Sequence, residues 1–118
     1  MILVDTSVWI SHLRDGNNEL ISLLNEGDVI CHPFIIGEIA CGNLKNRSEI
    51  IRLLQALPEA IVAEHKEILQ FIDNNELMGK GLGYIDIHLL ASVLLTDARL
   101  WTFDKRLDNI ARKILVNY

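Results

Sequence analysis

Basic charge, cysteine and long apolar runs are all scarce in this chain of 118 residues, and each scarcity excludes a class of protein. Lys and Arg number 11 against 16 Asp and Glu, a formal net charge of −5, which argues against duplex binding through a broad basic face. Two cysteines do not make a disulfide framework, so we expect reduced thiols in a cytoplasmic protein. No apolar run approaches the roughly 18 residues of a transmembrane helix. Because Asp5 interrupts the first apolar run and no cationic stretch precedes it, we expect no signal peptide.

Apolar residues, in contrast, are abundant. They make up 50% of the chain, which excludes a disordered or low-complexity protein. A chain of this length can bury a core without disulfides or structural metals. We therefore expect a single domain spanning residues 1–118.

Short apolar runs alternate with segments of helical periodicity. The runs predict strands at 2–4, 29–30, 61–63 and 100–102, and a last edge strand at Val116. Helices are expected at 8–13, 20–24, 34–41, 50–57, 68–72, 84–95 and from 104 onward, with breaks at 16–18, 27, 42 and 58. Strands alternating with helices indicate βαβ units, hence an α/β domain whose parallel sheet carries helices on both faces.

Two acidic residues stand where helical spacing calls for an apolar side chain. Glu38 has Phe34, Ile35 and Cys41 at its i−4, i−3 and i+3 positions. Asp86 is surrounded in the same way by leucines and glycine at 82, 83, 89 and 90. Acidic side chains are rarely buried without a partner, and neither stripe offers a Lys or Arg. Each of these carboxylates is therefore expected to face a polar cleft or a cation.

Two further acids, Asp5 and Asp104, follow the predicted strands directly. Ligands of open parallel sheets bind beyond the carboxyl ends of the strands, so both carboxylates are expected at that edge. An aspartate at a helix start is also an ordinary N-cap, and Asp5 or Ser7 could cap the first helix in this way. Asp108, one turn after Asp104, is either a solvated helix residue or a fifth acid of the group.

If the four acids converge, they need a counter-charge. Two like charges about 4 Å apart repel by about 4 kcal/mol at an effective dielectric constant near 20. The group must therefore be partly protonated or bind a cation. An all-carboxylate site suits Mg²⁺ or Mn²⁺ rather than zinc. The neighbouring hydroxyls of Thr6, Ser7 and Thr102 could orient the carboxylates or a metal-bound water.

The histidines and tryptophans give weaker signals. Cys31-His32 has no second ligand pair at zinc spacing, so we predict no zinc site there. We expect most histidines to lie at the surface or to cap helices. Trp9 and Trp101 lie on apolar segments and are expected in the core rather than as platforms for bases.

Four segments carry the most specific pattern of the chain: VDTSVWI, IIGEIACG, GLGYIDIHLLASVLL and LWTFDKRL. In this order, and covering essentially the whole chain, they resemble the motifs of PIN-domain ribonucleases, with the nearest likeness to the VapC-type toxins of bacterial toxin–antitoxin modules. One position departs from the pattern: Phe103 stands where many relatives carry Arg or another polar residue, which bears on substrate contacts there.

The resemblance assigns roles to residues that the chain's own pattern had singled out. It implies that Asp5, Glu38, Asp86 and Asp104 form the acidic catalytic site, with Asp5, Asp86 and Asp104 as metal ligands and Ser7 and Thr102 as accessory hydroxyls. It further implies a Mg²⁺- or Mn²⁺-dependent endoribonuclease in a three-layer α/β/α sandwich. Such proteins are usually homodimers inhibited by a small cognate antitoxin.

Other functions fit parts of the same pattern. A housekeeping nuclease of the PIN type would carry the same acids. A receiver-like phosphoacceptor module also places acids at the end of the first strand, but it needs a lysine after a late strand. Here no lysine stands between Thr102 and Asp104. A non-catalytic module that binds a partner through its acidic pocket is a third alternative.

Apolar stripes on two predicted helices exceed what a thin sheet can cover. One stripe holds Leu20, Leu23 and Leu24, and the other includes Ile50 and Leu53. We expect part of this surface to form a homodimer contact or a groove for an antitoxin.

Overall fold

Three short parallel strands form the centre of the molecule. The computed structural model describes residues 1–118 and orders the strands β2-β1-β3, where β1 is Ile2–Val4, β2 is Val29–Ile30 and β3 is Arg99–Trp101. Val4 of β1 lies opposite Trp101 of β3, so these two strands end at the same level. β1 is the central strand, and all three of its residues are buried.

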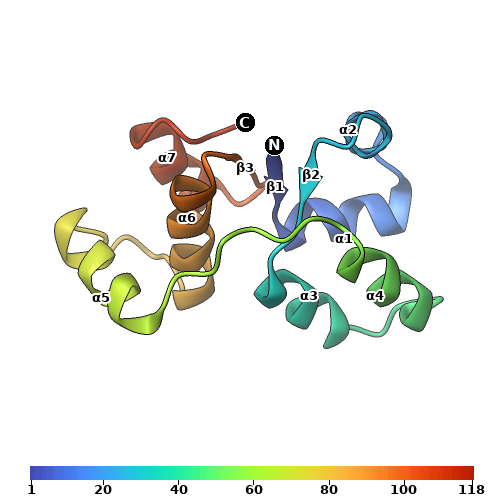
Figure 1. Cartoon of the computed structure of the whole chain (residues 1–118), viewed down its shortest axis with the longest axis horizontal. Coiled ribbons are helices and arrows are strands. Elements are labelled where there is room, and N and C mark those ends of the chain that lie inside the picture. The colour runs from blue at the N-terminus through green and yellow to red at the C-terminus, as the bar shows by residue number, and fades with distance from the viewer.

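Seven helices surround this sheet, and they confirm the predicted α/β class. Figure 1 shows α5, α6 and α7 on one side of the strands and α1 to α4 on the other, with the two termini close together. None of the helices has the length and apolar character that crossing a membrane requires. The helices are α1 Thr6–Asp15, α2 Asn18–Asn25, α3 Pro33–Ala40, α4 Arg47–Gln55, α5 His65–Asn74, α6 Tyr84–Thr96 and α7 Lys105–Lys113.

Local sequence signals account for the helix boundaries. Gly16 ends α1 with a φ of 79°, a conformation that favours glycine. Asn17 then caps α2, because its side chain accepts a hydrogen bond from the Leu20 N–H at 3.0 Å. Pro33 occupies the first turn of α3, where its missing N–H costs no helical hydrogen bond.

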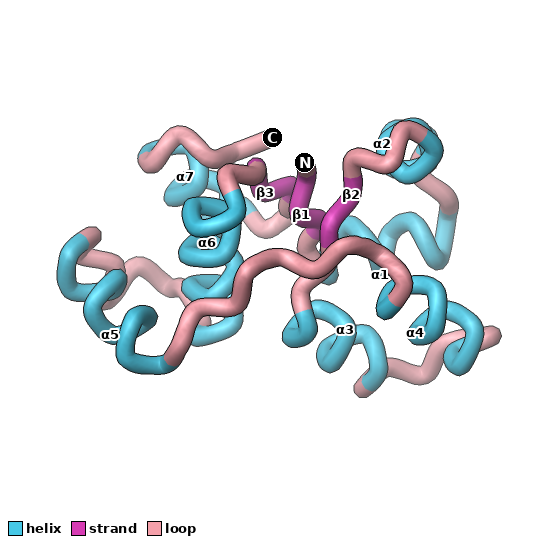
Figure 2. Tube along the Cα trace, in the orientation of Figure 1, coloured by secondary structure: helices cyan, strands magenta, loops and turns pink.

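The strand predicted at 61–63 is wrong. This segment belongs to the long connection from α4 to α5, which Figure 2 shows as a loop crossing in front of the sheet. Only Glu59 pairs with a strand end, in a single bridge to Cys31. The chain then leaves the sheet, and the Ile61 N–H donates to Thr96 Oγ1 at 3.0 Å instead of to a neighbouring strand. The predicted edge strand at Val116 is reduced to one bridge between Leu100 and Asn117.

Helix α6 is the most buried helix of the fold, as its nearly continuous apolar sequence predicts. Every residue from Ile87 to Val93 is buried. This run includes His88, whose side chain is 3% exposed. The expectation that histidines lie mostly at the surface is therefore wrong for His88, because a helix covered on most sides buries polar residues along with apolar ones.

His32 is a cap, as expected, but a completely buried one. Its exposed fraction is 0%, and its Nδ1 accepts a hydrogen bond from the Phe34 N–H at 3.0 Å at the start of α3. Burial first, and then the charge of the nearby His88, lower the pKa of the His32 imidazole from 6.5 to about 4. The fold therefore holds His32 in its neutral form, which fixes the start of the helix that carries Glu38.

We predict that acidification destabilises the protein through His32. A histidine whose folded pKa is depressed binds fewer protons than in the unfolded chain, so its stabilising effect is complete above pH 6.5 and declines as the pH falls towards 4. Between pH 7 and pH 5 this group should remove about 2 kcal/mol from the free energy of unfolding. Urea denaturation at both pH values measures the loss, and His32→Asn, which keeps a capping oxygen, should show a smaller one. An equal loss in both proteins would contradict the prediction.

Candidate acidic site

Asp5 lies at the end of β1, where its buried carboxylate is held by two hydroxyl groups. Ser7 Oγ and Thr102 Oγ1 each donate to Asp5 Oδ2 at 2.7 Å. The backbone of Asp5 is at the N-cap position of α1, but its side chain makes no capping hydrogen bond, and Ser7 lies within the helix. The predicted capping role of these two side chains is therefore wrong, because both are engaged with each other and with Thr102.

The segment after β3 is joined to Asp5 through the same hydroxyls. Thr102 Oγ1 accepts from the Asp104 N–H at 3.0 Å, and Ser7 Oγ accepts from the Phe103 N–H at 3.0 Å. Asp104 itself caps α7, since its Oδ1 accepts from the Leu107 N–H at 3.0 Å. The N-cap interpretation of Asp104 is thus confirmed, and the cap uses only one of its two carboxylate oxygens.

Glu38 reaches this edge of the sheet from α3. Thr6 Oγ1, in the first turn of α1, donates to Glu38 Oε1 at 2.8 Å. The neighbouring Ile35 and Ile39 are fully buried, while Glu38 is exposed. The helix therefore packs its isoleucines into the core and leaves the carboxylate facing solvent beside the start of α1.

Asp86 comes from the first turn of α6 and is half-buried. Its Oδ2 accepts from the Gly83 N–H at 3.1 Å. Burial raises the pKa of the Asp86 carboxyl above its ordinary value, the Gly83 hydrogen bond opposes this rise, and the charges of Asp5 and Asp104 add to it. The structure thus brings the three aspartates near enough to repel one another.

All four carboxylates share one pattern: the chain holds one oxygen of each and leaves the other without a hydrogen-bond partner. None of them forms a salt bridge, because the two salt bridges of the chain join Arg14 to Asp15 and Arg112 to Asp108. Free carboxylate oxygens without a salt-bridge partner fit a hard divalent cation.

As the side chains lie, no three of them are close enough to bind one ion together. Mg²⁺ does not require three, since it keeps several waters and binds through one or two carboxylates. The donor chemistry of the edge therefore fits this type of ion without a closed protein cage.

Asp108 is not part of this group. Its Oδ2 accepts from Arg112 Nε at 2.8 Å, four residues further along the exposed face of α7. The structure therefore favours the interpretation of Asp108 as an ordinary helix residue in an i, i+4 ion pair.

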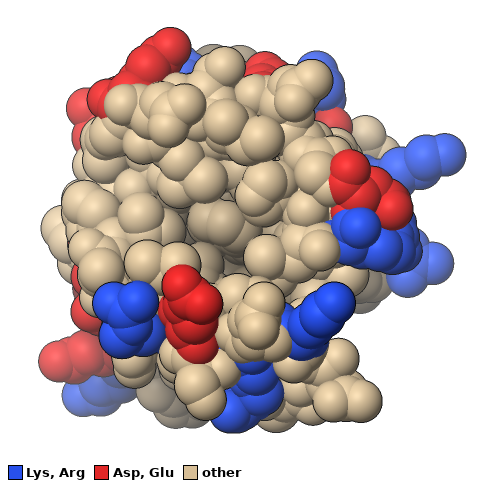
Figure 3. Space-filling model, turned by 90° about the vertical axis from the view of Figure 1, so that its right-hand side faces the viewer, with Lys and Arg blue, Asp and Glu red and all other residues tan.

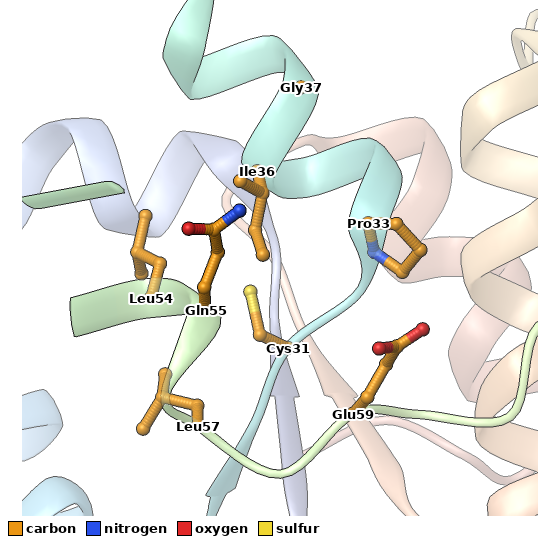
Figure 4. A pocket seen from close by; sticks show the side chains of 8 residues that line it. All are labelled: Cys31, Pro33, Ile36, Gly37, Leu54, Gln55, Leu57 and Glu59. Carbon is orange, nitrogen blue, oxygen red and sulfur yellow. The ribbon is translucent and has the colours of Figure 1, made fainter. Parts of the chain in front are cut away.

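The protein has another hollow, away from the acids. Figure 4 shows Gln55 and Leu57 on one side of it and Glu59 on the other, with the Cys31 thiol pointing into the space between them. Its volume is about 440 Å³. Burial raises the pKa of the Cys31 thiol to about 11, so this sulfur stays protonated and unreactive at neutral pH. With one carboxylate and one inert thiol, this hollow lacks the acids of a metal site.

Sequence reasoning missed the aromatic side chains beside the acids. Phe34 and Tyr84 line a pocket together with Glu38. Phe34 stands one helical turn before Glu38, so its position could have indicated this placement, whereas Tyr84 stands two residues before Asp86, a helical spacing that does not place the two on one face.

Comparison with known proteins agrees with this arrangement. The family model described as PIN domain matches residues 2–113. Two curated relatives, each named Ribonuclease VapC32, come from Mycobacterium tuberculosis strains CDC 1551 / Oshkosh and ATCC 25618 / H37Rv. Each is 48% identical to this chain over 108 residues, which is 91% of the chain and 87% of the relative.

We predict that Thr102→Val destabilises the fold by about 2 kcal/mol. The substitution removes a hydrogen bond to the buried Asp5 carboxylate and the acceptor of the Asp104 N–H. Thr6→Val is the matched control, because its hydroxyl donates to the exposed Glu38 and should cost less than about 1 kcal/mol. Urea denaturation measures the free energy of unfolding of both variants. Equal losses would contradict the prediction, because the hydrogen bond to Asp5 would then stabilise the fold no more than the one to Glu38.

Proposed function

The chain belongs to the PIN domain family, and from that premise we propose that it is a metal-dependent endoribonuclease acting in the cytoplasm as the toxin of a type II toxin–antitoxin module. The observation that carries the proposal is the set of four carboxylates at one edge of the sheet, each with one free oxygen and no basic partner. The ribonuclease names of the two relatives, together with their identity over most of the chain, support RNA as the substrate.

In this proposal Asp5, Asp86 and Asp104 hold Mg²⁺ or Mn²⁺, directly or through water. Such an ion lowers the pKa of a bound water and stabilises the charge that develops on a phosphoryl group. Glu38 completes the acidic set from α3. Ser7 and Thr102 act on Asp5, whose Oδ2 they occupy, which leaves its Oδ1 free to bind an ion.

The reaction we propose is hydrolysis by in-line displacement at phosphorus. A water molecule attacks, one of the free carboxylate oxygens takes its proton, and the bond from phosphorus to the 3′ oxygen breaks. The 3′ oxygen stays on the upstream fragment as a hydroxyl after gaining a proton, and the downstream fragment keeps the phosphate at its 5′ end. None of the four carboxylates is neutralised by a salt bridge, so the metal of this proposal would supply the attraction for the scissile phosphate.

An apolar groove between α1, α2 and α4 supports an antitoxin partner. Figure 3 shows this face of the molecule, with a hollowed centre and charged side chains mostly around the rim. The groove has a volume of about 320 Å³, and Trp9, Leu24, Ile50 and Leu53 are among its lining residues. A groove of this kind suits the apolar face of a partner helix.

A homodimer is also part of the proposal, through a different surface. Leu69 of α5 and Leu94 and Leu95 of α6 are each between 45% and 49% exposed. A shallow apolar hollow lies between the same two helices. Exposed apolar side chains gathered in this way mark a protein–protein contact.

We predict that Asp86→Asn lowers the rate of RNA cleavage at least about 100-fold. The substitution removes one carboxylate of the set while keeping the side-chain shape and the acceptor for the Gly83 N–H. Cleavage of a structured RNA in Mg²⁺ or Mn²⁺, followed by gel electrophoresis and analysis of the 5′ and 3′ ends, measures the effect. EDTA should stop the wild-type reaction.

The matched control for this experiment is Asp108→Asn. It removes the same charge one turn beyond Asp104, from a carboxylate that is paired with Arg112. Its activity should stay within a few-fold of wild type. Full activity in Asp86→Asn, or cleavage that continues in EDTA, would contradict the proposed roles.

A further inference from the structure

The pocket that Phe34 and Tyr84 line together with Glu38 lies directly beside the other acids of the site. It has a volume of about 420 Å³, within the range of about 300–1,000 Å³ that is common for small-molecule sites. Its lining includes Gly37 and Glu38 from α3, Cys41 directly after that helix, and Tyr84 from the start of α6. Glu38 is the only charged residue that lines it, and the same side chain belongs to the acidic set.

Two aromatic rings line this pocket, and both pack on the buried His88. The ring centroids of Phe34 and Tyr84 each lie 4.7 Å from that of His88, at interplanar angles of 76° and 78°. Both rings therefore lie nearly perpendicular to the plane of the imidazole, in edge-to-face contact. Phe34 comes from α3 and Tyr84 from α6, so the two helices contribute one ring each.

The Tyr84 ring is held in place although it is exposed. Its side chain is 43% exposed, and its hydroxyl forms a 2.6 Å hydrogen bond with His65 Nδ1 on α5. An aromatic side chain fixed at both its ring and its hydroxyl loses little conformational freedom when a ligand stacks on it. The ring is thus a preformed flat surface beside the acids.

From these contacts we propose that this pocket, which we call the aromatic pocket, receives one unstacked nucleobase of the RNA next to the bond that is cut. The inference rests on the proposed ribonuclease function and adds a substrate contact to it. Bases stack on aromatic side chains of proteins that bind single-stranded RNA. Glu38 repels a phosphate from the pocket, so the base enters and the backbone stays over the acids. The free Oε2 of Glu38 can accept a hydrogen bond from an amino group of the base.

The first test measures binding without cleavage. The wild-type chain in Mg²⁺ is mixed with a short unpaired RNA of mixed sequence whose phosphorothioate linkages resist hydrolysis, and the rate at which a thiol reagent modifies Cys41 is followed. Cys41 is exposed and lines the pocket. Cys31 is buried, with a thiol pKa of about 11, and should not react with the reagent. Unpaired RNA should slow the modification about fivefold or more, and a fully paired RNA duplex should not. Equal rates with and without unpaired RNA, or equal protection by the duplex, would overturn the proposal.

The second test measures the cleavage preference. Tyr84→Leu keeps an apolar side chain against His88 but removes the stacking face. It should raise KM about fivefold or more, with a smaller change in kcat, and flatten the base preference beside the cut sites in a random RNA pool. Tyr84→Phe keeps the ring and should retain the preference.

Tyr118→Leu provides the matched control. Tyr118 is also exposed, at 40%, and its hydroxyl is also hydrogen-bonded, to Glu19 on α2. This variant should cut like wild type. A Tyr84→Leu enzyme with unchanged KM and unchanged preference would overturn the base site while leaving the ribonuclease intact. If the wild-type chain cuts no RNA at all, the proposed function fails, and the Cys41 protection experiment still decides whether the pocket takes a base.

Discussion

The arrangement of the acidic edge depends on one buried carboxylate. Asp5 lies where two parallel strands end side by side, and its Oδ2 receives hydrogen bonds from Ser7 and Thr102, both at 2.7 Å. The same two hydroxyls accept the backbone N–H groups of residues 103 and 104. A buried charge without such donors would cost several kcal/mol. The two hydroxyl groups therefore stabilise the charge of Asp5 and also fix the segment that carries Asp104.

As a consequence, one oxygen of each carboxylate at this edge of the sheet accepts a hydrogen bond, and the other oxygen has no hydrogen-bond partner. Asp5 has two donors, the other three carboxylates have one each, and none of the four forms a salt bridge. Burial first, and then the charges of its acidic neighbours, raise the pKa of Asp86, so this arrangement disfavours the charged form of that carboxyl. Repulsion of this kind persists in enzymes because it gives the site its affinity for a cation. The aromatic pocket then extends the edge with a surface suited to a base rather than a phosphate.

Much of this could be predicted from the sequence because it depends on short-range signals. Apolar runs, helical periodicity and breaks such as Gly16 and Asn17 predicted the three strands and the helices. The position of acids on apolar stripes predicted Glu38 and Asp86 as site residues. The rest depends on contacts between distant parts of the chain. An apolar run at 61–63 does not reveal that the backbone leaves the sheet after Glu59. Nor does the position of Asp5 in the sequence reveal that its carboxylate accepts a hydrogen bond from a threonine 97 residues away instead of capping the first helix.

The central claim is that these carboxylates form a cation site, and Mn²⁺ binding tests it most directly. Urea denaturation of the wild-type chain and of Asp86→Asn, each with EDTA and with Mn²⁺, measures the effect on the free energy of unfolding without any RNA. Binding to the folded state alone should stabilise the wild type by about 2.7 kcal/mol at a Mn²⁺ concentration 100 times the dissociation constant. We expect this gain in the wild type and a much smaller one in Asp86→Asn. A wild-type chain whose stability does not change with Mn²⁺ would contradict the claim.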